Sequence, residues 1–102
     1  MSEKTSQNVS NTRKNTDNSA LLYPNPVGQD IGIVNALLTL SDDVTVTYRL
    51  YDATGKLLLD ESEKEKKGTI HKQFSLKNRA SGVYFLNITI GKDLITKQII
   101  LL

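Results

Sequence analysis

The sequence predicts an all-β fold, an antiparallel β-sandwich of about six to seven short strands. Apolar and polar residues alternate over several short segments, most regularly at residues 44–51 and 83–90. An alternation of period two is typical of strands with one buried face. Turn-forming residues recur between these segments about every 8–12 residues, a spacing typical of sandwiches. No segment outside these strands keeps a clear helical period.

The N-terminal segment predicts a linker and not a strand. Residues 1–20 are rich in Ser, Thr, Asn, Gln, Lys and Glu, with one Val and one Ala. Such a segment buries too little apolar surface to offset the entropy lost on ordering, so we expect disorder. We therefore divide the chain into a disordered polar linker, residues 1–21, and one folded domain, residues 22–102.

Both prolines of the chain lie in the word Tyr23-Pro24-Asn25-Pro26. Proline fixes φ and keeps the preceding residue extended, so this four-residue motif stiffens the chain where the linker meets the domain. Two interpretations stay open at this stage. The segment Tyr23–Pro26 is either a plain turn at the start of the domain or a motif that a partner recognises directly.

The first half of the domain predicts a strand followed by a hairpin. The run at residues 31–40 is compatible with a helical turn or two, but a first strand gives a coherent all-β arrangement. Residues 43–60 predict a β-hairpin, with a turn that Gly55 allows because glycine adopts positive φ. The charged segment 61–68 predicts the solvated tip of a second hairpin.

The second half predicts three further strands. Residues 69–76 alternate, with Ile70, Phe74 and Leu76 expected in the core. A turn-rich break at 77–82 precedes a strand at 83–90, and a turn at 91–93 precedes the closing strand at 94–102. One face of the 83–90 strand should be buried, and it consists of Tyr84, Leu86, Ile88 and Ile90.

Composition argues against most functional classes. The 102 residues hold no Cys and a formal net charge of +2, with acidic and basic residues interleaved. A nucleic-acid-binding protein gathers its basic residues on one face, so no nucleic-acid partner is expected. No apolar run approaches the ~18–20 residues that span a bilayer. The N-terminus has no apolar signal-peptide core, so an exported chain would be a fragment of a longer precursor.

Catalytic and metal sites are not predicted. His71 is the single histidine, and a histidine without a spaced partner is typical of a surface position and not of a metal ligand. The carboxylates at 60–65 lie among lysines in a segment expected to be solvated, whereas acid–base catalysis needs a perturbed carboxylate in a pocket. Asp42 and Asp43 alone supply too few oxygens for calcium. We expect no enzyme activity and no cofactor.

The order of four short motifs resembles a known family. The motifs are Tyr23-Pro24-Asn25-Pro26, Leu50-Tyr51-Asp52-Ala53-Thr54-Gly55-Lys56, Ser81-Gly82-Val83-Tyr84-Phe85-Leu86-Asn87-Ile88 and Lys97-Gln98-Ile99-Ile100. Each fits many β-hairpins, but the four in this order, covering residues 22–102, resemble the C-terminal sorting domain of type IX (Por) secretion cargo in Bacteroidetes.

The resemblance implies a fold and a role. The fold would be an Ig-like β-sandwich, expected to be a monomer, fused to an N-terminal cargo. The domain would direct that cargo from the periplasm through the outer-membrane translocon to the cell surface or the medium. A surface sortase would cut the linker, and the cargo would be joined to lipopolysaccharide. The expected partners are thus the type IX translocon and the sortase.

The resemblance also suggests which residues form the sorting motif. The last strand ends in four apolar residues beside a carboxylate, and a terminal edge strand is open to capture by β-augmentation. Its ending, Leu101-Leu102, differs from the basic ending that many members have. Gly55 and Gly82 are expected to be conformational requirements, and Tyr84 is expected in the core. The candidate sorting residues are Tyr23, Pro24, Asn25, Pro26, Gly55, Lys56, Gly82, Tyr84, Lys97, Ile99, Ile100, Leu101 and Leu102.

Two other classes remain as alternatives. A small Ig-like adhesion or carbohydrate-binding module on a secreted enzyme should show an exposed aromatic platform, for which Tyr48 and Tyr51 are the candidates. These two tyrosines are expected on opposite faces of one strand. A periplasmic inhibitor should show a rigid exposed loop, but the 61–68 segment is charged.

Overall fold

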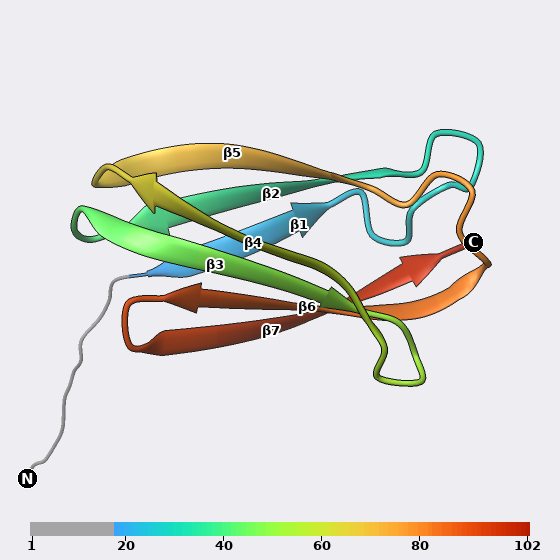
Figure 1. The fold of residues 1–102 in the computed structure, drawn as a ribbon. Coiled ribbons are helices and arrows are strands. Elements are labelled where there is room, and N and C mark those ends of the chain that lie inside the picture. The colour runs from blue at the N-terminus through green and yellow to red at the C-terminus, as the bar shows by residue number, and fades with distance from the viewer. Residues whose placement is uncertain (1–17) are drawn as a thin grey trace, which may run out of the picture.

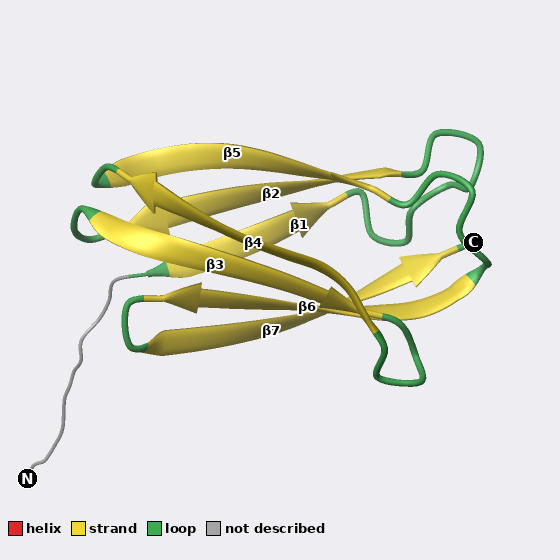
Figure 2. Ribbon diagram, viewed as in Figure 1, coloured by secondary structure: helices red, strands yellow, loops and turns green. Residues whose placement is uncertain are grey.

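The computed structural model describes residues 18–102, so residues 1–17 of the linker predicted for residues 1–21 lie outside this range. Seven strands and no helix form the described part of the chain (Figure 2). The strands are β1 (Ser19–Tyr23), β2 (Ile33–Leu40), β3 (Val44–Tyr51), β4 (Leu57–Glu65), β5 (Gly68–Ser75), β6 (Gly82–Ile90) and β7 (Asp93–Leu101).

The strands form two antiparallel sheets that face each other (Figure 1). One sheet has the order β1-β2-β5 and the other the order β4-β3-β6-β7. The chain changes sheets between β2 and β3, between β4 and β5, and between β5 and β6. This is an Ig-like β-sandwich, so the predicted fold class is confirmed.

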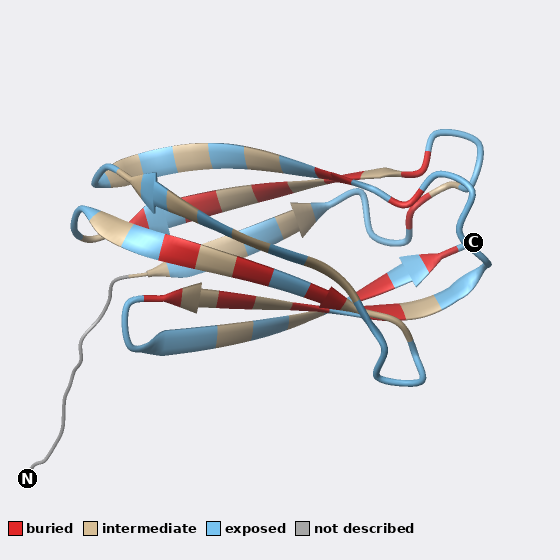
Figure 3. Cartoon of the chain, viewed as in Figure 1, coloured by how far each residue is buried: buried red, intermediate tan, exposed pale blue. Residues whose placement is uncertain are grey.

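The core lies between the sheets and consists of apolar side chains (Figure 3). The faces predicted for 44–50 and 84–90 point inward, and Phe74 and Leu76 are buried, whereas Ile70 is half-buried at the rim. No charged or polar residue of 18–102 is fully buried. The buried residues are Val27, Val34, Ala36, Leu38, Leu40, Val46, Tyr48, Leu50, Phe74, Leu76, Tyr84, Leu86, Ile88, Ile90, Ile99 and Leu101.

The ordered chain begins earlier than the sequence predicts. Strand β1 starts at Ser19, before the expected boundary at residue 22. It pairs with β2 along its whole length, and Ala20 and Leu22 pack against the core. Two inward side chains within a polar segment are a weak local signal, because the strand is held by a partner distant in sequence.

The charged segment 61–68 is not a solvated tip: residues up to Glu65 belong to β4, and only Lys66 and Lys67 separate it from β5. Alternate glutamates of β4 point inward at the edge of the sandwich. Glu61 and Glu63 lie 2.9 Å and 2.7 Å from the Nζ atom of Lys72 on β5. These ion pairs join the edges of the two sheets. Inward-pointing charges on edge strands also oppose edge-to-edge association.

Tyr48 lies beneath this ion-pair cluster. Its side chain is fully buried, and its ring lies 5.5 Å from the Lys72 Nζ and edge-on to Phe74. The hydroxyl has no hydrogen-bond partner within residues 18–102. Burial, with a smaller contribution from Glu65 and Glu63, raises the pKa of Tyr48 to about 12.

A second tyrosine fixes the turn before β6. The hydroxyl of Tyr84 donates a hydrogen bond of 2.5 Å to the carbonyl oxygen of Ala80. A tyrosine near the start of this strand that bonds a backbone group a few residues upstream is the tyrosine corner of Ig-like domains. Tyr84 is 5% exposed, so its predicted place in the core is confirmed.

Candidate functional site

The proline-containing segment 24–26 connects the two sheets, so it lies inside the folded domain and not before it. Residues up to Tyr23 pair with β2 in one sheet, whereas Val27 forms a parallel bridge with Leu101 in the other. The Val27 amide donates to the carbonyl oxygen of Ile100 over 2.7 Å, and the Leu102 amide donates to the carbonyl oxygen of Val27 over 2.9 Å. The segment 24–26 is therefore a crossover inside the domain.

The asparagine between the prolines replaces the backbone pairing that proline cannot provide. Proline has no N–H and is excluded from the interior of a ladder. The Asn25 side chain meets β7 instead, because its Nδ2 donates to the carbonyl oxygen of Gln98 over 2.7 Å. Its Oδ1 accepts from the amide of Ile100 over 3.0 Å. The outer edge of β7 from Gln98 onward is thus already occupied by residues 25–27.

This pairing bears directly on capture of the last strand by β-augmentation. The outward amides of Ile100 and Leu102, which an added strand would bond, are held by Asn25 and Val27. A partner strand would have to displace the crossover first. The open part of the β7 edge lies nearer its start, at residues 93–97.

Parts of the four motifs meet at one end of the sandwich, here called the distal pole and defined as residues 24–32, 52–56, 76–82 and 99–102. Registers explain the meeting: Tyr51 is paired with Phe85, and Gly82 with Leu101. In Figure 1 the connections at 24–32 and 76–82 lie near the C-terminal end of the chain and the 52–56 turn lies below them, whereas β1 begins at the opposite end. At that opposite end Asn18 contacts Ser41 and Asp93.

The turn at 52–56 is built around one carboxylate. Asp52 Oδ1 accepts hydrogen bonds from the Thr54 amide over 2.9 Å, the Thr54 hydroxyl over 2.6 Å and the Lys56 amide over 3.0 Å. The Thr54 hydroxyl, followed by the backbone of Lys56, lowers the pKa of Asp52. The carboxylate shapes the turn, and Lys56, at the closing end of the turn opposite Asp52, is exposed.

The two glycines of the motifs, Gly55 and Gly82, allow the backbone to adopt positive φ. Gly55 has φ of 90° and Gly82 has φ of 147°, values that side-chain-bearing residues rarely adopt. A Cβ atom placed on either glycine would meet no atom within 4 Å. The requirement is therefore conformational and not one of close packing, as predicted.

A shallow groove of about 500 Å³ lies beside the turn, on the outer face of the four-stranded sheet. Phe85, which is 37% exposed, forms part of its wall. Tyr51 contributes a second ring. Phe85 was not among the predicted sorting residues, although the alternation over 83–90 places it opposite the buried face of that strand.

The predicted sorting residues at the end of the chain differ in exposure according to the face of β7 on which they lie. Ile99 and Leu101 are buried, whereas Ile100 and Leu102 are 40% and 62% exposed. Lys97 lies in the inward row beside Leu86, is half-buried, and belongs to the middle of the strand and not to the distal pole. Tyr23 is 42% exposed and lies on the outer face of the three-stranded sheet near His71.

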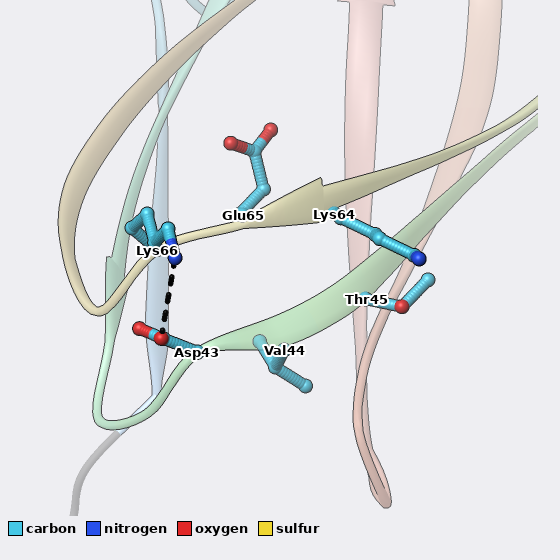
Figure 4. Close-up of a pocket in the computed structure, with 6 residues that line it drawn as sticks. All are labelled: Asp43, Val44, Thr45, Lys64, Glu65 and Lys66. Atoms are coloured by element: carbon cyan, nitrogen blue, oxygen red, sulfur yellow. Dashed lines mark ion pairs between the residues drawn. The ribbon is translucent and has the colours of Figure 1, made fainter.

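A second hollow, of about 420 Å³, lies at the opposite end of the sandwich where β3 begins and β4 ends (Figure 4). Asp43 and Lys66 form an ion pair of 3.7 Å across its mouth. Its lining mixes both charge signs with Val44 and Thr45. None of the predicted sorting residues lines it.

The described residues contain no group of three or more His, Cys, Asp or Glu side chains placed to hold a metal ion. Within residues 18–102 there is also no helix with the length and apolar character needed to cross a membrane.

Fold and site together define a small Ig-like domain whose two ends differ, with parts of the four sequence motifs at one end. The chain belongs to the family of secretion system C-terminal sorting domains, whose model matches residues 21–102. The resemblance predicted from the four motifs is thereby confirmed. The domain is a type IX secretion sorting domain.

A solved structure has the same fold. The crystal structure of dimeric latent PorU from Porphyromonas gingivalis aligns with 85% of this chain, with a TM-score of 0.63 and 18% sequence identity. The aligned region is 9% of the PorU chain, so the similarity concerns one domain of a much larger protein. No curated protein sequence matches the chain.

Proposed function

We propose that this domain is a non-catalytic signal that directs an N-terminally attached cargo across the outer membrane by type IX secretion. The cargo would pass through the periplasm and reach the cell surface or the medium. A sortase would remove the domain by cutting the segment that precedes β1, and the released cargo would be anchored to lipopolysaccharide. Membership of the sorting-domain family supports the secretion role.

The surface that the translocon recognises would be the distal pole. The observation behind this proposal is the meeting of the crossover, the 52–56 turn and the end of β7 at the end of the sandwich opposite Asn18. A cargo attached before Asn18 would leave that pole uncovered. The pole also presents Lys56 and the groove beside Phe85.

Recognition must be tested with changes that leave the fold intact, because deleting the end of β7 would remove the buried Ile99 and Leu101 and unfold the domain. Lys56→Glu changes one exposed charge at the distal pole. Lys92→Glu is the matched control, since Lys92 is an exposed turn lysine at the opposite pole. Such surface changes usually cost under about 0.5 kcal/mol.

The experiment fuses the domain to a reporter in a strain with type IX secretion and follows the reporter in the periplasm and at the surface. We expect the native domain and Lys92→Glu to export it, and Lys56→Glu to retain it in the periplasm with an unchanged melting temperature. Export of all three would place recognition elsewhere on the domain. Failure of the native domain to export would reject the sorting function itself.

A Gly-Ser extension after Leu102 tests the role of the terminal carboxylate. The extension should fit without unfolding, because the Leu102 side chain is 62% exposed while its amide remains bonded to Val27. Periplasmic retention of the extended fusion would support recognition of the chain end. Normal export would limit recognition to the loops of the pole.

A further inference from the structure

The outer face of the three-stranded sheet has no charged residue at its outward strand positions. Outward residues alternate along β1 from Ser19, along β2 from Ile33 and along β5 from Thr69. None of these outward positions is Asp, Glu, Lys or Arg. The outer face of the other sheet, by contrast, includes the ion pair of Arg49 with Asp60.

Two aromatic rings lie on this uncharged face. Tyr23 on β1 and His71 on β5 reach toward each other over β2, with ring centroids 6.5 Å apart and an interplanar angle of 18°. Both residues are exposed. The exposed parts of these rings offer apolar surface to the C–H groups of a ligand.

Amide side chains lie next to the rings in a fixed arrangement. Asn35 Oδ1 accepts from His71 Nε2 over 2.9 Å and from Gln73 Nε2 over 3.0 Å, and Asn35 Nδ2 donates to the carbonyl oxygen of Tyr23 over 3.2 Å. Within residues 18–102 the Gln73 Oε1 atom and the Tyr23 hydroxyl make no hydrogen bond. They are available to a ligand, and the bonded groups hold them in place before it arrives.

We propose that this face, defined by Tyr23, Asn35, His71 and Gln73, is a binding site for neutral carbohydrate. A pyranose has an apolar C–H face and a rim of hydroxyl groups. The rings match the apolar face of the sugar, and the amide and phenol groups can form hydrogen bonds with its hydroxyl groups. The lack of fixed charge favours an uncharged ligand, because no ion has to be desolvated when the face is covered. The site is independent of the distal pole and of the proposed sorting function.

The test uses ¹⁵N-labelled protein titrated with cellohexaose and with maltohexaose, followed by NMR. We expect saturable shifts in the side-chain amides of Asn35 and Gln73 and in the backbone amide of His71. Gln73→Ala and His71→Ala should each weaken binding at least tenfold. Gln98→Ala is the matched control on the outer face of the other sheet, and it should bind as the native domain does.

Three outcomes would overturn the proposal. The first is the absence of saturable shifts with both oligosaccharides, and the second is equal binding by Gln73→Ala and the native domain. The third is a set of shifts at Asn35 and Gln73 that follow protein concentration without sugar, which would make this face a contact between two copies of the chain. Melting temperatures of the variants should match the native value, since the substituted side chains are exposed.

Discussion

Asn25 and Ile100, 75 positions apart in sequence, are joined by a hydrogen bond of 3.0 Å from the Ile100 amide to the Asn25 side-chain oxygen. With its second bond, to Gln98, the side chain of Asn25 behaves as a short piece of strand between two prolines. This explains why an asparagine stands between the two prolines. The crossover requires a residue that pairs through its side chain.

The first prediction concerns this side chain. Asn25→Ala removes both hydrogen bonds, so the free energy of unfolding should fall by about 1–2 kcal/mol. Urea unfolding followed by circular dichroism measures the change. Gln29→Ala is the control, because Gln29 makes a single long bond of 3.3 Å to an exposed loop carbonyl. An equal loss in both variants would show that Asn25 has no special part in the crossover.

The second prediction separates the two faces of β7. Ile99 is fully buried and Ile100 is 40% exposed, although they are adjacent and chemically identical. Ile99→Ala should cost about 2–5 kcal/mol, a large part of the ~5–10 kcal/mol available to a domain of this size. Ile100→Ala should cost under about 1 kcal/mol. Similar losses for both would contradict the register of β7 against β6.

The third prediction compares two tyrosine hydroxyls. Tyr84→Phe deletes the donor of the bond to Ala80 and should lower the free energy of unfolding by about 1–2 kcal/mol. Tyr48→Phe deletes a buried hydroxyl that has no partner within residues 18–102. This change should leave stability within about 0.5 kcal/mol of the native value or raise it. A large loss in Tyr48→Phe would mean that its hydroxyl is hydrogen-bonded in solution.

The fourth prediction concerns alkaline pH. The pKa of Tyr48 is raised from 10.0 to about 12, so between these values the unfolded chain loses its proton while the folded chain keeps it. The contribution of Tyr48 to the free energy of unfolding is therefore complete below pH 10 and falls as the pH rises toward 12. Lys72, whose pKa is raised chiefly by its hydrogen bonds to Glu63 and Glu61, acts in the same direction.

The measurement is urea unfolding at several pH values from 9 to 12 for the native domain and for Tyr48→Phe, the range being set by the raised pKa of Tyr48. The native domain should lose on the order of 2–3 kcal/mol more than the variant, since one pKa unit corresponds to about 1.4 kcal/mol. Parallel pH profiles would show that Tyr48 titrates normally in the folded state.

The local alternation of apolar and polar residues predicted those strands that bury one whole face. The strands at 44–51 and 83–90 were found because each alternates over eight or more residues and packs one whole face inward. Strand β1 was missed because its five residues offer only Ala20 and Leu22 to the core. Its pairing with β2 supplies the rest of its stability, and no local feature of the sequence encodes that pairing.

The charged end of β4 was misassigned for a related reason. Every second residue from Glu61 is a glutamate, and on sequence grounds such a segment resembles a solvated loop. Two of these glutamates, Glu61 and Glu63, form ion pairs with Lys72, which comes from the other sheet. At the candidate site, Gly55 and Gly82 were predicted correctly as conformational residues. The contact of Asn25 and Val27 with β7 could not be predicted, because it depends on the tertiary arrangement.

The crossover also determines how the domain responds to mechanical load. A pull applied at Asn18 against an anchor at the distal pole runs along the length of β1, whose residues are all paired with β2. Val27 beyond it is bonded in parallel to the end of β7. The hydrogen bonds of β1 with β2 lie across the direction of such a pull, so the pull loads them in shear, and the bonds of Val27 with the end of β7 follow them along the chain. In a domain held at the distal pole, traction on the N-terminal end is therefore opposed by several hydrogen bonds of β1 at once.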